Sequence, residues 1–290
     1  MRPDSLHKIT TCLVGFTAVY DSPSISSLQN PTVRHLVRLR DNRQRQRARE
    51  IVVDGIRETH RALDAGLTLK GLFLVDRQSA EVDELAKRVP ASVVTISLPV
   101  LQKIAFGQHH RDVVAWFDEP SKPLASLKLS PLPIVIVLDA IEKPGNIGAV
   151  LRSADAIGAD AVVLCQAACD LFNPSVIRAS LGTVFSVPTA QADRTSTIAW
   201  LREHGITPVT ARVDAQSVYW DVDYRQPVAI VIGSEANGLG EHWERDVTGN
   251  IIETIGVRIP MHGAADSLNA SVSAALLMFE AARQRRDIRS

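Results

Sequence analysis

The sequence predicts an α/β protein of two domains, a small α/β domain followed by a larger domain built around a parallel sheet. Three observations support this prediction. Strand-like and helix-like segments alternate over residues 51–117, a proline-rich stretch occupies residues 119–133, and residues 134–164 show a strand, a helix and a second strand. Because a helical crossover joins parallel strands, the second domain is expected to contain an open parallel sheet.

The composition is typical of a globular protein with a large core. The 290 residues are 46% hydrophobic and 22% charged, and their formal net charge is zero. This balance argues against a protein that wraps nucleic acid with its whole surface, although a local basic patch is allowed. No apolar run has the length of a membrane span, so a membrane protein is not expected.

The cysteines and histidines predict neither a disulfide framework nor a metal site. Cys12, Cys165 and Cys169 show no paired spacing, and the last two have no histidine nearby. The only histidine cluster, His109-His110, is interpreted as a loop feature rather than as a pair of ligands. Reduced thiols are typical of a cytoplasmic protein, which is therefore the expected location.

Residues 1–30 are predicted to form a poorly ordered extension. Residues 9–20 follow Lys8 and loosely resemble the apolar part of a secretory signal. The run contains three threonines, however, and no small-residue cleavage site follows it. A secretory signal is therefore the less favoured interpretation.

A basic segment opens the first domain, which is predicted to span residues 31–118. Pro31 after Asn30 favours a helix start, and apolar residues between the arginines predict a short amphipathic helix that continues into a solvated arm. Arginine forks match phosphate oxygens, so the segment is a candidate phosphate-binding surface, with an ordinary solvated face as the alternative. The candidate residues are Arg34, Arg38, Arg40, Arg43, Arg45 and Arg47.

Short apolar runs predict the rest of the first domain. The expected strands are residues 51–53, 72–75, 93–96 and 113–117, and the expected helices are residues 56–65, 80–88 and 98–105. Residues 119–133 contain four prolines and form the predicted linker, with restricted bending. The second domain is then expected to span residues 134–290.

The second domain opens with Ile134–Leu138, an apolar run that predicts a strand buried on both faces. Arg152 lies off the buried face predicted for the following helix, and that face comprises Val150, Leu151, Ala154 and Ile157. A strand is expected at residues 161–164, and a helix is expected to start at Asn173-Pro174. The alternation continues with a strand at residues 185–188, a helix at residues 198–203, and strands at residues 207–212 and 228–232.

Near the carboxyl end, residues 251–259 resemble a strand that Pro260 stops, because proline cannot donate to a sheet ladder. Ser267 is predicted to cap the next helix, whose expected buried face comprises Leu268, Val272, Ala275, Leu276 and Phe279. This arrangement leaves Ser267 and Asn269 at the helix start, where free backbone N–H groups suit a small ligand. A cap without further function is the alternative.

Three loops of the second domain carry polar residues that packing does not require. They comprise residues 146–152, 233–238 and 267–269. Ligands of open parallel sheets bind at the carboxyl ends of the strands, so these loops are expected to converge on one site. The first strand and helix lack the G-x-G-x-x-G pattern of dinucleotide sites, which disfavours an oxidoreductase.

Taken in order, the three loops resemble the signature motifs of the SpoU (TrmH) family of RNA 2′-O-ribose methyltransferases in the SPOUT superfamily. The segment Arg178-Ala179-Ser180-x-Gly182 is also similar to the family's intermediate segment. The residues that carry the resemblance are Asn146 and Arg152; Gly233, Glu235 and Gly238; and Ile259, Pro260, Met261, Ser267, Leu268, Asn269 and Ser271. The first domain resembles a ribosomal-protein (L30e-like) RNA-binding domain, with Val53-Asp54-Gly55 and residues 109–115 as landmarks.

The resemblance implies S-adenosylmethionine as cofactor, a deep trefoil knot in the second domain, and a homodimer with active sites near the subunit interface. It implies methylation of a ribose 2′-hydroxyl in structured RNA. A separate RNA-recognition domain favours 23S ribosomal RNA, with transfer RNA as the close variant. A knotted RNA-binding protein without catalytic activity is the alternative from another class.

The family pattern also implies roles for individual residues. The cofactor is expected to bind Gly233, Ile259, Leu268, Met261 and Leu138, and no metal is expected. An arginine guanidinium normally stays charged, so Arg152 suits stabilisation of the ribose oxyanion better than a literal base role. An ordinary helix ion pair with Asp155 is the structural alternative. Asn146, Glu235, Ser267 and Asn269 are expected to orient the arginine, the ribose or the phosphate.

Overall fold

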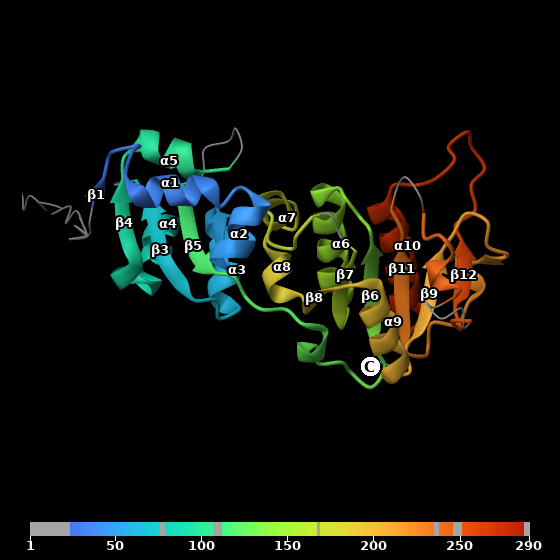
Figure 1. Ribbon diagram of the computed structural model, residues 1–290. Helices are drawn as coiled ribbons and strands as arrows, with labels where there is room; N and C mark the ends of the chain where they lie inside the picture. Colours follow the sequence, from blue (N-terminus) through green and yellow to red (C-terminus); the bar gives the residue numbers. More distant parts are fainter. Residues whose placement is uncertain are drawn as a thin grey trace, which may run out of the picture.

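The computed structural model describes residues 24–75, 79–106, 112–166, 169–234, 238–245 and 251–286. These residues form two α/β domains that lie side by side (Figure 1). Several predictions fall outside the described residues and concern Cys12, His109, His110, Glu235 and residues 1–23. Within the described ranges, no helix combines the length and the hydropathy needed to cross a membrane.

The first domain is a five-stranded mixed sheet in the order β1-β4-β3-β5-β2. Its strands are β1 (Ser24–Ile25), β2 (Glu50–Asp54), β3 (Leu69–Leu74), β4 (Val93–Ile96) and β5 (Val113–Asp118). Its helices are α1 (Pro31–Arg38), α2 (Asn42–Ala48), α3 (Ile56–Asp64), α4 (Ala80–Arg88) and α5 (Leu98–Ile104). All seven elements predicted between residues 51 and 117 are confirmed. The prediction that residues 1–30 are poorly ordered is wrong for Ser24 and Ile25, because these residues form β1 and pair with β4.

The predicted helix at Pro31 is confirmed, but the solvated arm after it is wrong. Asn30 caps α1 by accepting from the backbone N–H of Thr32 at 2.8 Å. Asp41 then caps a second helix, α2, by accepting from Gln44 N–H at 3.1 Å. The basic segment therefore folds back as a helical pair, and one side of α2 is buried.

The second domain is a seven-stranded sheet in the order β10-β12-β9-β11-β6-β7-β8, and every pair is parallel. The predicted α/β class with a parallel sheet is confirmed. The strands are β6 (Ile134–Asp139), β7 (Ala161–Cys165), β8 (Thr189–Ala192), β9 (Thr207–Ala211), β10 (Ser217–Val218), β11 (Val228–Ile232) and β12 (Ile255–Arg258). The helices are α6 (Pro144–Ile157), α7 (Pro174–Ala179), α8 (Thr183–Ser186), α9 (Arg194–Glu203) and α10 (Ala270–Gln284).

Two strand predictions differ from the structure. The strand predicted at residues 185–188 is wrong, because Gly182 at φ 83° starts the short helix α8 and the strand begins only after Pro188. The strand predicted at residues 251–259 is shorter, since only Ile255–Arg258 pairs with β9 and β10. The predicted start of α7 at Asn173-Pro174 is confirmed.

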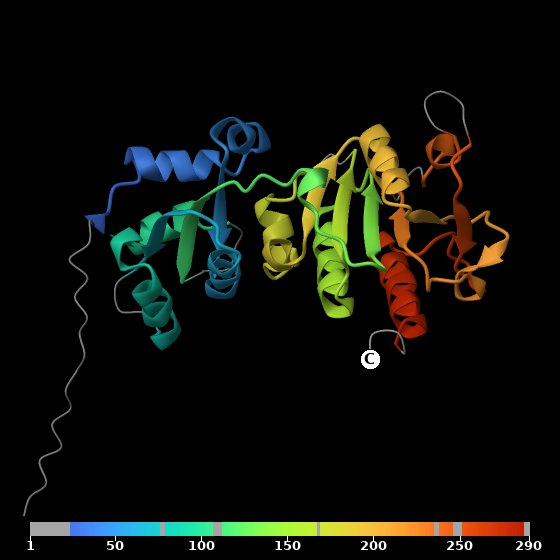
Figure 2. The same ribbon diagram turned by 90° about the horizontal axis from the view of Figure 1, so that it is seen from below.

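The helices cover both faces of the parallel sheet. Figure 2 shows α6 and α10 side by side on one face and α9 on the other. The predicted buried face of α6 is confirmed, but that of α10 is wrong. The buried residues of α10 are Ala270, Ala274, Leu277, Met278 and Ala281. Val272 and Phe279 are 46% and 53% exposed, whereas the buried side of α10 packs in the core of the domain.

The junction between the domains is held by directional bonds. Arg45 on α2 is 2% exposed and donates to the carbonyls of Leu39 and Arg40 at 2.8 and 2.7 Å. Its other terminal nitrogen donates to Asp170 of the second domain at 2.5 Å. Arg61 on α3 donates to the carbonyl of Leu181 at 3.1 Å. These bonds fix the first domain against the α7–α8 edge of the second.

The proline-rich segment between the domains packs along the second domain. Its leucines, Leu124, Leu127 and Leu129, lie against the apolar cluster under α9. The backbone N–H of Ser130 donates to Asp160 at 2.8 Å, and the carbonyl of Lys122 accepts from Gln191 N–H at 3.3 Å. This linker therefore packs against the surface of the second domain along its length.

Arg45→Ala is expected to destabilise the protein by about 3–5 kcal/mol, because it leaves the half-buried Asp170 and two backbone carbonyls without their donor. Arg47→Ala on the exposed side of α2 is the matched control, with an expected change within about 0.5 kcal/mol. Urea unfolding followed by far-UV circular dichroism measures both. Equal midpoints for the two variants would contradict the structural role of Arg45.

Candidate functional site

The second and third signature loops line one cavity at the carboxyl ends of the strands. The cavity has a volume of about 510 Å³. Its lining from the two loops comprises Gly233, Ser234, Gly238, Ile259, Met261, Ser267 and Leu268. The site thus lies at the sheet edge where ligands of parallel sheets bind.

A hydrogen bond connects the first signature loop to this cavity. The side-chain nitrogen of Asn269 donates to Asn146 Oδ1 at 3.1 Å, across 123 positions of sequence. Asn146 is 8% exposed and lies in the first turn of α6. Since Ala270, the next residue after Asn269, lines the cavity, the first loop is one hydrogen bond away from it.

Asn269, and not Ser267, caps α10. Asn269 Oδ1 accepts from the backbone N–H of Ser271 at 2.9 Å and from its hydroxyl at 2.6 Å. The prediction of a Ser267 cap is wrong because the helix begins three residues later, at Ala270. Ser267 is therefore exposed and free to line the cavity.

The second signature loop closes tightly on itself. Gly238 donates its backbone N–H to the carbonyl of Ser234 at 3.0 Å. A Cβ on Gly233 would lie 2.4 Å from the backbone carbon and oxygen of Gly238, so a side chain at this position meets backbone. Glu235 lies in this loop but outside the described residues.

Of the five residues predicted to bind the cofactor, four line the cavity and one does not. Gly233, Ile259, Leu268 and Met261 line the cavity, whereas Leu138 does not. Leu138 is 1% exposed and packs in the core beneath α6 and α10. The prediction that Leu138 lines the cofactor site is therefore corrected. Side chains alternate along a strand, and the side chain of Leu138 points into the core.

Arg152 is exposed on α6 and does not line the cavity. The alternative ion pair with Asp155 is not formed, since Arg152 has no ion pair within the described residues. Asp155 instead accepts from the Ser186 hydroxyl at 3.1 Å. Gly148 lies on the same helix, where a Cβ would lie 2.4 Å from Ala179 Cβ. This close approach seats α6 on the intermediate segment and leaves Arg152 on the outer side.

Three charged residues of the cavity were missed by sequence reasoning, namely Arg212, Asp214 and Asp266. Arg212 donates to Asp214 at 3.1 Å and to the carbonyl of Gly240 at 3.1 Å, and it pairs with Glu244 at 2.8 Å. The hydrogen bond to Asp214 raises the pKa of Arg212. Arg212 follows the carboxyl end of β9, so the strand-end rule that identified the other loops applies to it as well.

The two cysteines within the described residues, Cys165 and Cys169, do not contribute reactive groups. Burial raises the pKa of the Cys165 thiol to about 12 and that of Cys169 to about 11, so both stay protonated at neutral pH. Across the described ranges, no group of three or more histidine, cysteine, aspartate or glutamate side chains could hold a metal ion.

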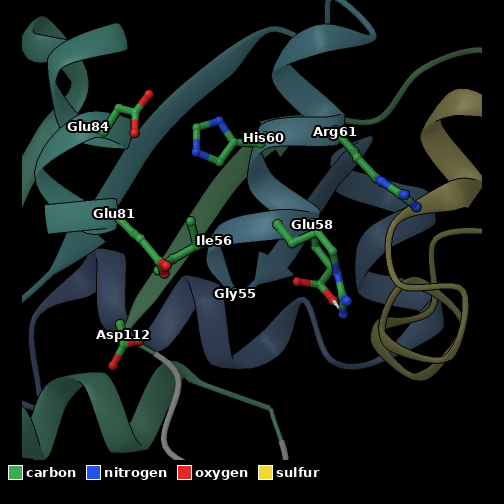
Figure 3. A pocket seen from close by; sticks show the side chains of 9 residues that line it. Gly55, Ile56, Glu58, His60, Arg61, Glu81, Glu84 and Asp112 are labelled. Atoms are coloured by element: carbon green, nitrogen blue, oxygen red, sulfur yellow. Dashed lines mark hydrogen bonds and ion pairs between the residues drawn. The ribbon is translucent and has the colours of Figure 1, made fainter. Parts of the chain in front are cut away.

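A second hollow, of about 610 Å³, lies in the first domain between α3 and α4 (Figure 3). Glu81, Glu84 and Asp112 line it together with His60 and Arg61. Its lining contains four carboxylates, including that of Glu58, and only two arginines, so the hollow is a poor site for an RNA backbone.

The basic segment offers fewer exposed arginines than predicted. Arg34, Arg38, Arg43 and Arg47 are exposed. Arg40 is half-buried and donates to the carbonyls of Lys103 and Ala105. The prediction that Arg45 contacts phosphate is wrong in this structure, because its guanidinium is buried against Asp170.

Comparison with known proteins agrees with this geometry. The SpoU rRNA Methylase family model matches residues 133–279, and the model of the MRM3-like substrate binding domain matches residues 30–115. The chain is 31% identical to a 23S rRNA (uridine(2479)-2′-O)-methyltransferase from Streptomyces viridochromogenes, over 85% of this chain and 87% of that protein.

Two solved structures are similar to most of the chain. A crystal structure of an RNA 2′-O ribose methyltransferase is 38% identical, with a TM-score of 0.78 over 91% of this chain and 99% of that one. An AdoMet-bound rRNA methyltransferase from Sinorhizobium meliloti is 29% identical, with a TM-score of 0.81 over 93% of this chain and 99% of that one. Fold and site therefore define a two-domain methyltransferase that carries a substrate-binding domain ahead of its parallel sheet. The chain belongs to the SpoU rRNA methylase family, which confirms the resemblance.

Gly233→Ala is expected to destabilise the protein by about 1–3 kcal/mol, because the new methyl group meets the backbone of Gly238. Gly145→Ala in the first turn of α6 is the control. A Cβ there meets nothing within 4 Å, so the helix is expected to gain about 0.5–1 kcal/mol. Thermal and urea unfolding measure both variants. A Gly233→Ala variant as stable as the wild type would show that the loop does not need this close approach.

Proposed function

We propose that the protein transfers a methyl group from S-adenosylmethionine to a ribose 2′-hydroxyl of structured RNA, with 23S ribosomal RNA as the substrate. One observation carries the proposal. The second and third signature loops line the same cavity, and the Asn146–Asn269 hydrogen bond connects the first signature loop to it. The AdoMet bound in the similar Sinorhizobium meliloti structure and the 23S rRNA activity of the Streptomyces relative support the cofactor and the substrate.

The cavity fits the cofactor in size and in lining. Its volume of about 510 Å³ lies within the range of small-molecule sites. Ile232, Ile259 and Leu268 supply apolar walls suited to an adenine ring, while Asp214 and Asp266 supply acceptors for its hydroxyl and ammonium groups. The glycines at 233 and 238 keep side chains out of the loop, so backbone groups can approach the ligand.

When bound, S-adenosylmethionine supplies an electrophilic methyl group. The chain must then hold the ribose oxygen in line with that group and stabilise its negative charge as the proton leaves. Arg152 is the residue for this charge, since it is exposed and no partner within the described residues neutralises it. Asn146 and Asn269 orient the reacting groups, and Ser267 lies in the cavity wall to hold the ribose or phosphate. Glu235 of the second loop is proposed to orient the arginine.

The exposed arginines of the first domain bind the RNA backbone. Arg34, Arg38, Arg43 and Arg47 lie on α1 and α2, where charge attraction to phosphate depends on salt. A separate substrate-binding domain suits a large folded RNA, which favours ribosomal over transfer RNA. This substrate implies a cytoplasmic location.

The functional unit is a homodimer, and the second domain contains the trefoil knot that the family resemblance implies. The exposed apolar face of α10 supports the dimer, because Val272 and Phe279 would otherwise face water. This face continues onto α6 through Ala149 and Ser153, beside Arg152. A second copy docked there would therefore cover the apolar residues and border the catalytic arginine.

Arg152→Ala is expected to lower the rate of methyl transfer by about 10²–10³-fold, because it removes the charge that stabilises the oxyanion. Binding of S-adenosylmethionine, measured by calorimetry, is expected to survive, since Arg152 does not line the cavity. Asp155→Asn, one turn along α6, is the control and should keep its activity.

Mapping of 2′-O-methyl positions in 23S rRNA from cells with and without the gene identifies the substrate. Full turnover by Arg152→Ala would refute its assignment, and absence of cofactor binding in the wild type would favour a non-catalytic RNA-binding protein.

Phe279→Asp is expected to convert the dimer into monomers, because a carboxylate in an apolar interface is desolvated without a partner. Ile251→Asp, at an apolar residue that is 74% exposed elsewhere, is the matched control and should stay dimeric. Analytical ultracentrifugation measures both. A wild-type monomer at micromolar concentration, or a dimeric Phe279→Asp variant, would place the interface elsewhere or exclude it.

A further inference from the structure

A buried carboxylate at the end of β6 receives three hydrogen bonds. Asp139 is 2% exposed. Arg194 donates Nε and a terminal nitrogen to its two oxygens at 3.0 and 3.1 Å. Trp243 donates its indole N–H to Asp139 Oδ2 at 2.7 Å. An ionised carboxylate is suited to this position because it accepts all three bonds and balances the guanidinium charge.

Trp243 belongs to the segment that forms one wall of the cavity. Gly238, Leu239 and Gly240 line the cavity, and the turn Glu241–Trp243 follows directly. Trp243 itself is fully buried and does not line the cavity. The buried hydrogen bond between Trp243 and Asp139 therefore attaches this wall to the end of β6.

Arg212 holds the same wall from the side of β9. It donates to the carbonyl of Gly240 at 3.1 Å and pairs with Glu244 at 2.8 Å. Gly238 and Gly240 have φ values of 60° and 58°, a conformation that other residues rarely adopt. Because so short a glycine-rich segment has little stability of its own, its position depends on these two attachments.

We propose that Asp139 is a positioning residue for the cofactor, acting through Trp243 to set the position of the 238–244 wall against the opposite wall of Ile259 and Leu268. The inference rests on the proposed binding of S-adenosylmethionine in this cavity. Arg194 fixes the orientation of the Asp139 carboxylate. The carboxylate in turn fixes the position of Trp243 and of the wall segment that contains Trp243. Neither Arg194 nor Trp243 lines the cavity.

The test compares two tryptophans of one apolar cluster. Trp243 and Trp200 both lie in the cluster under α9, and both are buried, but only Trp243 bonds to Asp139. Trp243→Phe keeps most of the ring and removes the donor. Trp200→Phe is the matched control for loss of buried indole volume. Isothermal calorimetry with S-adenosylmethionine and thermal unfolding are measured on the full chain of each variant.

Both variants are expected to lower the melting temperature, but only Trp243→Phe should weaken S-adenosylmethionine binding, by about tenfold. In turnover assays its KM for the cofactor should rise, while kcat at saturating cofactor stays near that of the wild type. Asp139→Asn, which loses the charge and one acceptor, should show the same pattern if Trp243→Phe does not fold.

Unchanged cofactor affinity in folded Trp243→Phe or Asp139→Asn would overturn the inference. Equal weakening by Trp200→Phe would overturn it as well, since the effect would then follow from general loss of core packing. The wild type is titrated first, and failure of the wild type to bind S-adenosylmethionine would count against the proposed function and not against the wall attachment.

Discussion

The catalytic domain depends on one hydrogen bond between two asparagines, Asn146 and Asn269. Asn269 donates its amide nitrogen to Asn146 while its amide oxygen caps α10. An amide can do both because it carries a donor and an acceptor on separate atoms, whereas an ionised carboxylate offers acceptors only. The bond brings the first turns of α6 and α10 together. The first turns of both helices consequently lie close to the cavity, which Ala270 at the start of α10 lines.

The packing of α10 follows from this constraint. α10 contacts α6 and β11, and three of the five residues on its buried side are the small residues Ala270, Ala274 and Ala281. The larger apolar residues Val272 and Phe279 are then forced to the outer side. The close contact inside the domain and the apolar face outside it are therefore two consequences of one sequence pattern.

Local sequence patterns predicted most of the fold and the region of the site. Short apolar runs bounded by proline and glycine located the strands, and the strand-end rule identified loops that meet in space. The buried side of α10 could not be predicted, since alanine and large apolar residues occur around the whole helix. Arg45 gave no local signal of burial, because its partner Asp170 lies 125 positions away. Leu138 was chosen for the site although the next residue, Asp139, is the one that bonds toward the cavity wall, and one position along a strand reverses the face.

The fixed junction between the domains constrains the substrate. The first domain docks beside α7 and α8 at the β7–β8 side of the sheet, whereas the cavity lies beside β9, β11 and β12 (Figure 1). Four strand spacings separate β8 from β9, which corresponds to about 19 Å. Within one chain, an RNA that contacts the basic helices and the cavity together must span more than this distance. A single nucleotide cannot do so, and a folded RNA can. If the basic helices contact the substrate as proposed, this separation favours recognition of RNA by its folded shape.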